Sequence, residues 1–558
     1  MDEYERWRSS PVLTAEQRAE LSALDEREKN DRFYRNLAFG TAGLRGVTGM
    51  GTNRMNEYVV RQATTALARV LLAAGTAAQG VCIGCDCRLG ARMLAEEAAW
   101  ALRCCGVPVF LFAAPRPTPE LSFAVRTLGA AAGINVTASH NPREYNGYKV
   151  YWSDGAQLPP DRAALVAEEM AHIDVLSPRP AETELCAPLT VLGADMDERY
   201  MNAVARCACA PGLPGQTDLR VVYTAFHGVG GAIVPEVLRR QGLKDLFFVE
   251  EQMAPDGRFP TLPKPNPEEP GTMALAEARA REVGADLVLA TDPDSDRIGV
   301  AVRDEDGGYV ELSGNRVGAL LTDYLLRARA EQGTLPPHPC IIQTLVTSEL
   351  SRRIAEDHGA ACFVTFTGFK YMAERLAALE REGVWQYLLA YEEAIGYMTG
   401  DHARDKDGVA AALLLCEMAA WYRLQGRTLL DGLRALWARH GYFDERTVSV
   451  QLPGADGMKR MADIMASLRR DPPAEVVGRA VTRMRDHLSG QCSDGTAAEP
   501  VGSDVLVWEL DGGSRVVVRP SGTEPKLKIY ALARADGERQ AAALAESIAA
   551  QMRARCER

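Results

Sequence analysis

Two apolar runs, Val81-Cys82-Ile83-Gly84 and Val109-Phe110-Leu111-Phe112, lie on either side of the segment Met93–Cys105, whose apolar residues recur with helical spacing. Strand-like runs separated by a helix are typical of layered α/β structure. The same alternation extends from about residue 56 to about residue 435, with helical periodicity over Val59–Leu72. We therefore predict an α/β fold for most of the chain.

The last part of the chain has a different pattern of apolar segments. Beyond Arg446 the apolar runs are short, as in Arg515–Arg519 and Lys526–Ala533, and an Ala-rich helix is expected over Glu538–Met552. This pattern predicts a smaller α+β domain. Breaks in the pattern near residues 211–216, 332–339 and 440–441 divide the chain into four predicted domains: 1–212, 213–334, 335–440 and 441–558.

Charge and hydropathy exclude several classes of protein. The chain has 558 residues and a net charge of −12, which disfavours binding to nucleic acid or to anionic membranes. The first 36 residues are highly charged and no segment holds 18 consecutive apolar residues, so we expect no signal peptide, no membrane span and a cytoplasmic location. The sequence does not indicate which oligomeric state the protein adopts.

The thirteen cysteines fit a reducing compartment, where thiols stay reduced. Cys82, Cys85 and Cys87 could form half of a zinc site if a further cysteine completed it, the candidates being Cys104, Cys105, Cys207 and Cys209. Residues 81–84 are typical of a buried strand, and no clean second Cys-x-x-Cys pair exists. We therefore favour buried thiols over zinc.

A polar loop follows the apolar run Gly133–Val136. Residues 137–142 read Thr-Ala-Ser-His-Asn-Pro, which places the Ser139 hydroxyl on a loop at the end of a predicted strand. The Gly-x-Ser-x-Gly pattern of serine hydrolases is absent around it. A turn without chemistry is the alternative, since Ser, Thr and Asn favour such turns.

Three carboxylates alternate in a second loop, at Asp292, Asp294 and Asp296, between the strand-like runs 287–290 and 298–302. Alternate residues of an extended loop point to one side, and oxygen ligands favour Mg²⁺ or Mn²⁺. An EF-hand is rejected, because Arg297 and Arg303 stand where that loop needs Gly and Glu. A solvated acidic turn remains the alternative.

A phosphate on Ser139 would add an anionic ligand to such a metal site. The excess negative charge would then need cations, for which the candidates are Arg45, Lys149, Arg297 and Lys370.

Two further loops suit a phosphorylated sugar. The segment Arg519-Pro-Ser-Gly-Thr-Glu-Pro-Lys526 combines a Ser-Gly-Thr turn with Arg and Lys, which favours phosphate binding over a plain hairpin. Glu392 and Glu393 follow the apolar run 387–390 and could accept hydrogen bonds from sugar hydroxyls. They could equally begin a helix.

In this order, from about Ala38 to Tyr530, the four loops resemble those of the α-D-phosphohexomutases, the family of phosphoglucomutases and phosphomannomutases. Asp86 with Arg88 and the segments 39–46, 146–149 and 222–230 extend the resemblance. Asp31-Arg32-Phe33 is similar to the branch that contains phosphoglucomutase-2 and phosphopentomutase-like enzymes. The resemblance implies three related α/β domains and a smaller C-terminal α+β domain around a central cleft.

The resemblance also implies roles for individual residues. Ser139 would be the phosphoserine and would bind Mg²⁺ together with the three aspartates. Arg45, His140 and Lys149 would orient the reacting phosphoryl group and move protons, and Arg297 would contact substrate. The remaining substrate ligands would be Thr367, Gly368, Lys370 and Glu392 for the sugar, and Arg519, Ser521, Gly522 and Thr523 for its non-reacting phosphate.

The implied reaction converts glucose 1-phosphate and glucose 6-phosphate through glucose 1,6-bisphosphate, which also serves as activator. The sugar loop departs from the family pattern, since Ala394 and Gly396 stand where many members have Ser and His. This departure leaves Lys149 as the favoured general base. It also keeps phosphopentomutase, phosphomannomutase and sugar-bisphosphate synthase as alternatives. A Mg²⁺-dependent phosphatase and a non-catalytic sugar-phosphate sensor are rivals from other classes.

Overall fold

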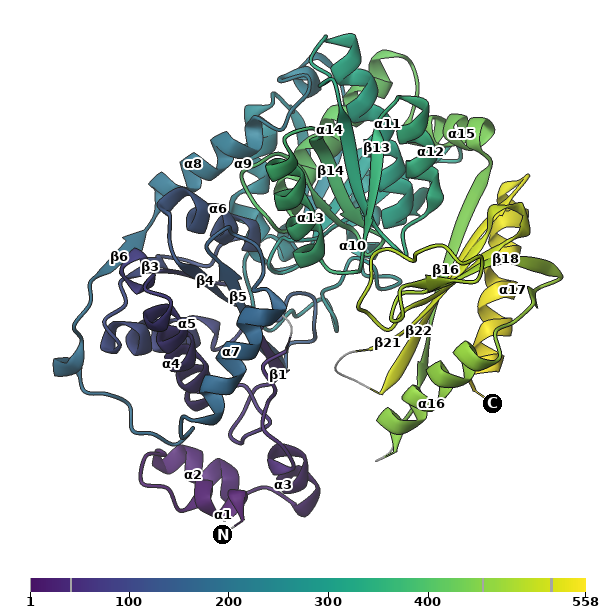
Figure 1. The fold of residues 1–558 in the computed structure, drawn as a ribbon. Coiled ribbons are helices and arrows are strands. Elements are labelled where there is room, and N and C mark those ends of the chain that lie inside the picture. The colour runs from purple at the N-terminus through teal and green to yellow at the C-terminus, as the bar shows by residue number, and fades with distance from the viewer. Residues whose placement is uncertain (1, 41–42, 454–455, 522–524, 558) are drawn as a thin grey trace. The chain divides into compact units, whose positions relative to one another are not determined.

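The computed structural model describes residues 2–40, 43–453, 456–521 and 525–557. The chain forms two compact units. The first unit comprises Met1–Ser313 and Ile395–Gln425, and the second comprises Gly314–Ala394 and Gly426–Arg558. Figure 1 gives the labels of the elements along the chain.

The first sheet of the first unit has six strands in the order β1-β5-β4-β2-β3-β6. Strand β2 pairs in parallel with β3 and β4, whereas β5 runs antiparallel to both β4 and β1. The strands are β1 (Gly43–Val47), β2 (Val81–Cys85), β3 (Val109–Phe112), β4 (Ala132–Val136), β5 (Tyr145–Trp152) and β6 (Leu189–Leu192). Parallel pairing of separated strands confirms the α/β interpretation of residues 81–112.

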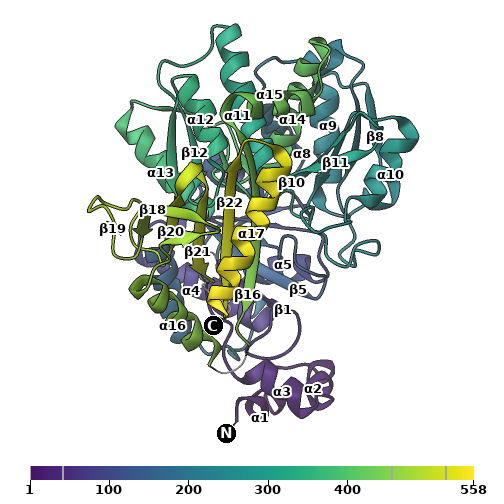
Figure 2. The same cartoon turned by 90° about the vertical axis from the view of Figure 1, so that its right-hand side faces the viewer.

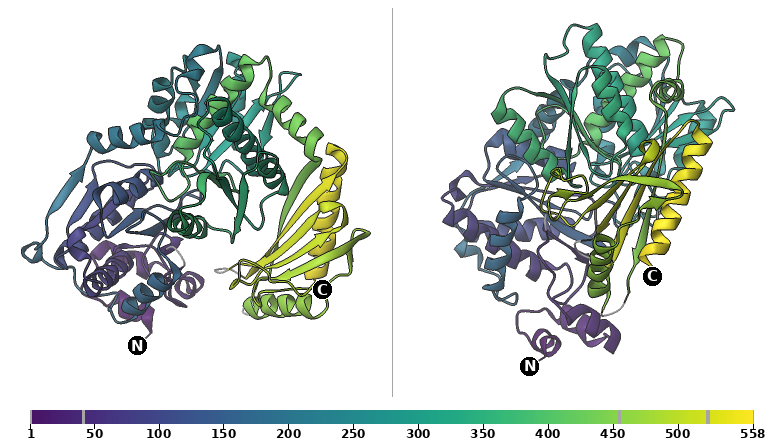
Figure 3. Two further views of the ribbon diagram at one scale, coloured as in Figure 1. Left: turned by 45° about the horizontal axis from the view of Figure 1, so that its top comes forward. Right: turned by 45° about the vertical axis from the view of Figure 1, so that its right-hand side comes forward.

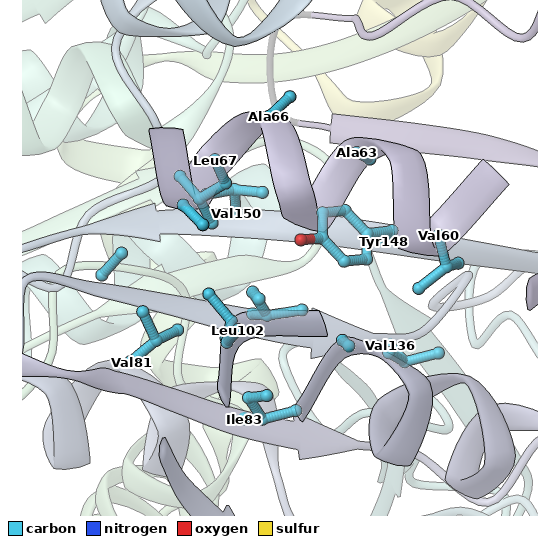
Figure 4. Close-up of a cluster of buried hydrophobic side chains, with 14 of the residues drawn as sticks. Val60, Ala63, Ala66, Leu67, Val81, Ile83, Leu102, Val136, Tyr148 and Val150 are labelled. Carbon is cyan, nitrogen blue, oxygen red and sulfur yellow. The ribbon is translucent and has the colours of Figure 1, made fainter. Parts of the chain in front are cut away.

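Helices cover both faces of this sheet: α4 (Glu57–Ala73), α5 (Ala91–Cys104), α6 (Thr118–Leu128) and α7 (Pro160–Ala171). On one face, side chains of α4, α5 and α7 form a core with alternate residues of β2, β4 and β5. Figure 4 shows Leu67 of α4 beside Val150 of β5 in this core. On the other face, a side chain at Gly133 would press against Val125 of α6. Removing a core side chain such as Leu67 would cost roughly 2–5 kcal/mol.

Three N-terminal helices, α1 (Glu3–Arg8), α2 (Ala15–Ser22) and α3 (Glu26–Phe33), precede the first sheet and lie beyond β1, shown in purple in Figure 1. They have a small core of their own, in which Trp7 stacks edge-on against Phe33 and against Tyr58 of α4. This aromatic contact fixes the helices to the first sheet, because burial of such rings is strongly favourable.

The second sheet of the first unit has five strands in the order β11-β10-β9-β7-β8. Strand β7 is parallel to β8 and β9, and the hairpin of β9 and β10 carries the acidic loop at its tip. The strands are β7 (Arg220–Thr224), β8 (Asp245–Phe248), β9 (Leu287–Thr291), β10 (Ile298–Arg303) and β11 (Tyr309–Leu312). The remaining α-helices of this unit are α8 (Ala194–Ala205), α9 (Val234–Arg240), α10 (Ala274–Val283) and α14 (Gly408–Leu424), and the remaining strand is β15 (Gly396–Met398).

In the second unit, β12 (Pro339–Thr344) lies between β13 (Ala361–Thr365) and β14 (Gln386–Glu392) and pairs in parallel with both. Glu392 is the last residue of β14 and Glu393 lies in a turn, so the alternative that these acids begin a helix is wrong. The helices are α11 (Gly314–Glu331), α12 (Glu349–Asp357), α13 (Phe369–Glu382) and α15 (Leu429–His440).

The C-terminal sheet of the second unit is antiparallel, in the order β16-β22-β21-β20-β18-β17 with β19 beside β18. Helix α17 packs along β16 and β22, as Figures 2 and 3 show. The strands are β16 (Tyr442–Gln451), β17 (Glu475–Val476), β18 (Arg479–Asp486), β19 (Gln491–Cys492), β20 (Leu506–Leu510), β21 (Arg515–Pro520) and β22 (Lys526–Ala535), and the helices are α16 (Gly457–Arg470) and α17 (Glu538–Cys556). The predicted change to short strands and a closing helix is confirmed.

The fold is that of three related α/β domains followed by a smaller C-terminal domain. The exact boundaries at 212/213, 334/335 and 440/441 stay predictions. Cys82 and Cys85 are buried in β2, and burial raises the pKa of the Cys85 thiol to about 12, which fits buried thiols. Among the described residues, no helix is both long and apolar enough to cross a bilayer.

Candidate active site

Ser139 occupies a strained position in the loop after β4. Its φ of 53° lies in the left-handed region, which costs free energy for a residue with a side chain. The Thr137 hydroxyl oxygen accepts the Ser139 backbone N–H at 2.8 Å and holds this turn. The buried Ser139 hydroxyl donates to Asp292 Oδ2 at 2.8 Å and lies 3.1 Å from Nδ1 of His140. The serine is therefore aimed at the acidic loop.

Arg88 stabilises the loop that carries Ser139. Its guanidinium, which is fully buried, donates to the backbone carbonyl oxygens of four loop residues: Ser139, Asn141, Pro142 and Tyr145. Asp86 lies 3.2 Å from Arg88 Nε, and burial raises the Asp86 pKa to about 6 although the Arg88 charge opposes the rise. The sequence analysis named these two residues together but gave them no role. The structure shows that Arg88 stabilises the serine loop through its carbonyl groups.

The three aspartates converge as the sequence predicts. Each is at most 1 % exposed, and one oxygen from each lies within 4.8 Å of the others. Such burial excludes the alternative of a solvated acidic turn. Oδ1 of Asp294 and Oδ1 of Asp296 have no hydrogen-bond partner in the described part of the chain. Buried carboxylate oxygens without partners are costly, so this set fits a divalent cation with oxygen ligands.

Two lysines partly neutralise the aspartates. Nζ of Lys149, on β5, lies 2.7 Å from Asp294 Oδ2 and 3.3 Å from Asp296 Oδ2. Nζ of Lys406, in the segment before α14, lies 2.9 Å from the same oxygen of Asp296. Sequence reasoning missed Lys406. Its only local signal is the charged run Asp405-Lys406-Asp407 directly before an apolar helix.

The lysines affect the pKa values of the three aspartates unequally. Burial raises the pKa of Asp292 well above its usual range, and the charges of Asp294 and Asp296 raise it further. Burial also opposes ionisation of Asp296, but Lys406 and Lys149 outweigh it and lower its pKa. Asp292 thus lacks a full positive partner, which a bound divalent cation would supply.

His140 and Lys149 differ in protonation. Burial lowers the His140 pKa well below its usual value, and the charges of Arg297 and Arg45 add to this, so the imidazole is neutral near pH 7. Burial opposes the charge of Lys149 as well, but the neighbouring Asp294 and Asp296 raise its pKa. Lys149 is therefore protonated in this state, and its role as a general base stays a prediction.

The two arginines predicted near this site have different partners. Arg45, on β1, donates to Asn141 Oδ1 at 3.2 Å. Arg297 follows the last aspartate, and its NH1 donates to Glu268 Oε2 at 3.0 Å. The first unit therefore gathers one group of predicted site residues: Arg45, Ser139, His140, Lys149, Asp292, Asp294, Asp296 and Arg297.

The second unit gathers another group. Glu392 Oε1 accepts the backbone N–H of Gly368 at 2.5 Å, and Gly368 adopts a φ of 117° that a side chain would strain. Thr367 directly precedes this glycine. Nζ of Lys370 lies 4.8 Å from the ring centre of Tyr371, and burial lowers its pKa. The hydrogen bond to Gly368 thus joins Glu392 to the segment that contains Thr367 and Lys370.

Arg519, at the end of β21, donates from Nε and NH2 to the Tyr530 hydroxyl at 3.2 and 3.1 Å. Burial opposes its charge, but Tyr530 and the charges of Glu393 and Glu392 raise its pKa. The Ser521 N–H donates to the Lys526 carbonyl at 2.9 Å. The predictions for Gly522 and Thr523 lie outside the described residues.

Comparison with known sequences assigns all four parts of the chain. Successive segments match the family described as phosphoglucomutase/phosphomannomutase: alpha/beta/alpha domain I over residues 36–176, domain II over 198–307, domain III over 313–440 and the C-terminal domain over 482–551. A phosphoglucomutase of Staphylococcus aureus (strain MSSA476) is 34 % identical over 513 residues, which cover 90 % of each chain.

Two solved structures share the fold. A phosphoglucomutase/phosphomannomutase family protein from Burkholderia thailandensis gives a TM-score of 0.67 at 21 % identity, covering 93 % of this chain and 97 % of the other. An N-acetylphosphoglucosamine mutase from Aspergillus fumigatus, in complex with GlcNAc-6P and magnesium, gives 0.52 at 14 % identity and covers 94 % and 96 %.

Proposed function

The chain belongs to the phosphoglucomutase/phosphomannomutase family and is a phosphosugar mutase, and on this premise we propose that it interconverts α-D-glucose 1-phosphate and glucose 6-phosphate through a phosphoserine at Ser139. The observation that carries the proposal is the 2.8 Å hydrogen bond from the Ser139 hydroxyl to Asp292 within the aspartate cluster. The relative from S. aureus named phosphoglucomutase supports the choice of glucose.

In the proposed reaction, the phosphoryl group of phospho-Ser139 passes to the free hydroxyl of a sugar monophosphate. The bond from phosphorus to Ser139 Oγ breaks as the bond to the sugar oxygen forms, and the sugar hydroxyl loses its proton. The resulting bisphosphate reverses its orientation and returns its other phosphate to Ser139. Phosphoryl transfer of this kind depends mainly on positioning and on charge neutralisation.

Mg²⁺ is the proposed cation, held by Asp292, Asp294, Asp296 and the phosphoserine. When bound, it would supply positive charge to the oxygens of the transferring phosphoryl group. Lys149 and Lys406 balance Asp294 and Asp296, so the site stays near neutrality with a dianion on Ser139. The neutral imidazole of His140, 3.1 Å from Ser139 Oγ, is better suited than the protonated Lys149 to accept the sugar proton.

The proposed ligands for the sugar and its other phosphate lie in the second unit. Glu392 would accept hydrogen bonds from sugar hydroxyls, with Thr367, Gly368 and Lys370 beside it. Arg519 and Ser521 would bind the non-reacting phosphate, with Gly522 and Thr523 assigned from the family pattern alone. The A. fumigatus mutase, which shares the fold, is described in complex with GlcNAc-6P and magnesium.

Phosphopentomutase is the second candidate, because Ala394 and Gly396 lack the hydroxyl and imidazole that many family members present to a hexose. One assay distinguishes the two candidate activities. Turnover of glucose 1-phosphate, mannose 1-phosphate and ribose 1-phosphate is compared with Mg²⁺ and a trace of glucose 1,6-bisphosphate. A higher kcat/KM for glucose 1-phosphate supports the proposal, and a preference for ribose 1-phosphate would assign the enzyme as a phosphopentomutase.

A further inference from the structure

A cavity of about 570 Å³ lies in the second unit, away from the sugar loop. It is bounded by the start of α12 and by residues of β18, β20 and β21, together with the turn of residues 511–514. Figure 2 shows these strands side by side. Its lining includes four arginines: Arg352, Arg353, Arg485 and Arg515. We call this the arginine cavity.

Arg515 is the most deeply placed of the four, at 7 % exposure. Its guanidinium donates to Glu349 Oε1 at 2.7 Å and to the Thr347 carbonyl at 2.6 Å. Its Nε has no hydrogen-bond partner among the residues that the structure describes. Burial lowers the Arg515 pKa, and the charges of Arg352 and Arg485 lower it further although Glu349 opposes them. The arginines therefore repel one another.

The acids of the cavity leave this repulsion incompletely balanced. Glu349 pairs with both Arg515 and Arg352, at 2.7 and 2.9 Å. Glu509 pairs with Arg485. Arg353 has no ion pair in the described part of the chain and lies 5.9 Å from the Phe443 ring centre.

Two partly buried carboxylates thus face four guanidiniums. The third acid of the lining, Asp511, is exposed at the rim and accepts the N–H of Gly512 in its own turn. An additional anion is the missing partner, because guanidinium groups crowded in a partly buried space gain most from a multidentate oxyanion.

The arginine cavity is separate from the proposed phosphate loop at Arg519. Both residues belong to β21, and four residues of strand place them roughly 13 Å apart. Arg519 is bonded to Tyr530, whereas Arg515 reaches back to the segment before α12. An anion in the cavity would contact α12 and the C-terminal sheet at once, and would hold these two elements together.

We propose that the arginine cavity binds a small phosphate-bearing anion, either inorganic phosphate or the phosphate group of a small metabolite. Arginine rather than lysine lines the cavity, and the planar guanidinium matches phosphate oxygens two at a time. The inference goes beyond the proposed mutase reaction and does not require it.

The experiment measures binding of inorganic phosphate and of pyrophosphate by titration calorimetry to the full chain carrying Arg519→Ala, which removes the proposed phosphate loop as a competitor. Arg353→Met and Arg485→Met are added separately to this background. Arg446→Met is the matched control, since this exposed arginine lies in the same sheet and pairs with Glu546 outside the cavity. Arg446→Met is expected to keep the background affinity.

Either cavity variant is expected to weaken binding at least about tenfold, as loss of a charge-assisted hydrogen bond implies. No binding in the Arg519→Ala background would overturn the proposal, and so would unchanged affinity in both cavity variants. Crystals grown with selenate give an independent readout, because an anomalous peak between Arg353 and Arg515 is expected and its absence contradicts the site. Sugar-phosphate turnover of the wild type is assayed separately, so a failed mutase assignment would not be mistaken for a failed anion site.

Discussion

The Ser139 hydroxyl donates to Oδ2 of Asp292 at 2.8 Å, across 153 residues of sequence and between two different sheets. The serine comes from the loop after β4 and the aspartate from the tip of the β9–β10 hairpin. Neither residue is unusual alone, since serine loops and acidic turns are common. Their contact places a nucleophile next to a cation site, which is the arrangement that phosphoryl transfer to and from a serine requires.

Arg88→Met is expected to disorder the serine loop, because four carbonyl oxygens lose their donor and the buried Asp86 loses its positively charged partner. Loss of one partner of a buried pair costs about 3–5 kcal/mol, and misplacement of Ser139 should lower kcat roughly a hundredfold. Thermal unfolding and steady-state kinetics test both effects. The control Arg69→Met removes an exposed ion pair with Glu169 and should change neither the stability nor kcat. Equal effects in the two variants would contradict the proposed role of Arg88 in holding the serine loop.

Mg²⁺ binding should weaken as the pH falls. The raised pKa of Asp292 means that a proton competes with the cation at pH values where an ordinary aspartate is already ionised. The dissociation constant for Mg²⁺, measured from about pH 8 down to about pH 5 by calorimetry, is expected to rise steadily. Asp292→Asn should weaken binding and remove most of this dependence, whereas Asp306→Asn, at an exposed turn, should leave it intact. A dissociation constant independent of pH in the wild type would refute this.

The buried pair of His402 and Asp407 should make stability depend on pH. Burial opposes the His402 charge, but Asp407 at 2.7 Å and Cys207 outweigh it and raise the pKa from its usual value near 6.5 to about 10. The contribution to stability is therefore complete below about pH 6.5 and is lost as the pH rises towards 10. Asp407 also accepts the backbone N–H groups of Val409 and Ala410 at the start of α14.

Melting temperatures at several pH values between these limits test the pair. The wild type should lose stability with rising pH, and His402→Gln should start lower and vary less. His172→Gln alters an exposed histidine of the same unit and should follow the wild type. Parallel curves for all three proteins would show that the pair contributes nothing.

The sugar loop offers a test of selectivity. Ala394→Ser restores the hydroxyl that many family members carry at this position, and should raise the ratio of kcat/KM for glucose 1-phosphate over ribose 1-phosphate by about tenfold. Ala394→Gly changes the same position without a hydroxyl and should leave the ratio near the wild-type value. An unchanged ratio in Ala394→Ser would remove this residue from the explanation of substrate choice.

Local signals in the sequence predicted much of the fold. Apolar runs and helical spacing located β2, β3, α5, β9 and β10 within a few residues, because each element buries a continuous apolar face. The sequence left Glu392 and Glu393 open between acceptors for sugar hydroxyls and the start of a helix. The structure excludes the helix start, because Glu392 ends β14 and Glu393 lies in a turn.

Some contacts between distant segments escaped sequence reasoning. Lys406 lies 110 residues beyond Asp296, and no pattern near either residue indicates that they pair. The role of Arg88 depends on carbonyl groups more than 50 residues away. The protonation of Lys149 and His140 also depends on burial and on charges from separate loops, which only the folded chain brings together.

Transfer of phosphate from Ser139 is the central claim, and peptide mass spectrometry tests it most directly. The wild type and Ser139→Ala are each incubated with glucose 1,6-bisphosphate and Mg²⁺, and the wild type is then mixed with glucose 6-phosphate for a single turnover. We predict one phosphoryl group on the peptide that contains Ser139, its loss to the sugar on mixing, and no such label or turnover in Ser139→Ala. A label on another residue, or full mutase activity in Ser139→Ala, would contradict the mechanism.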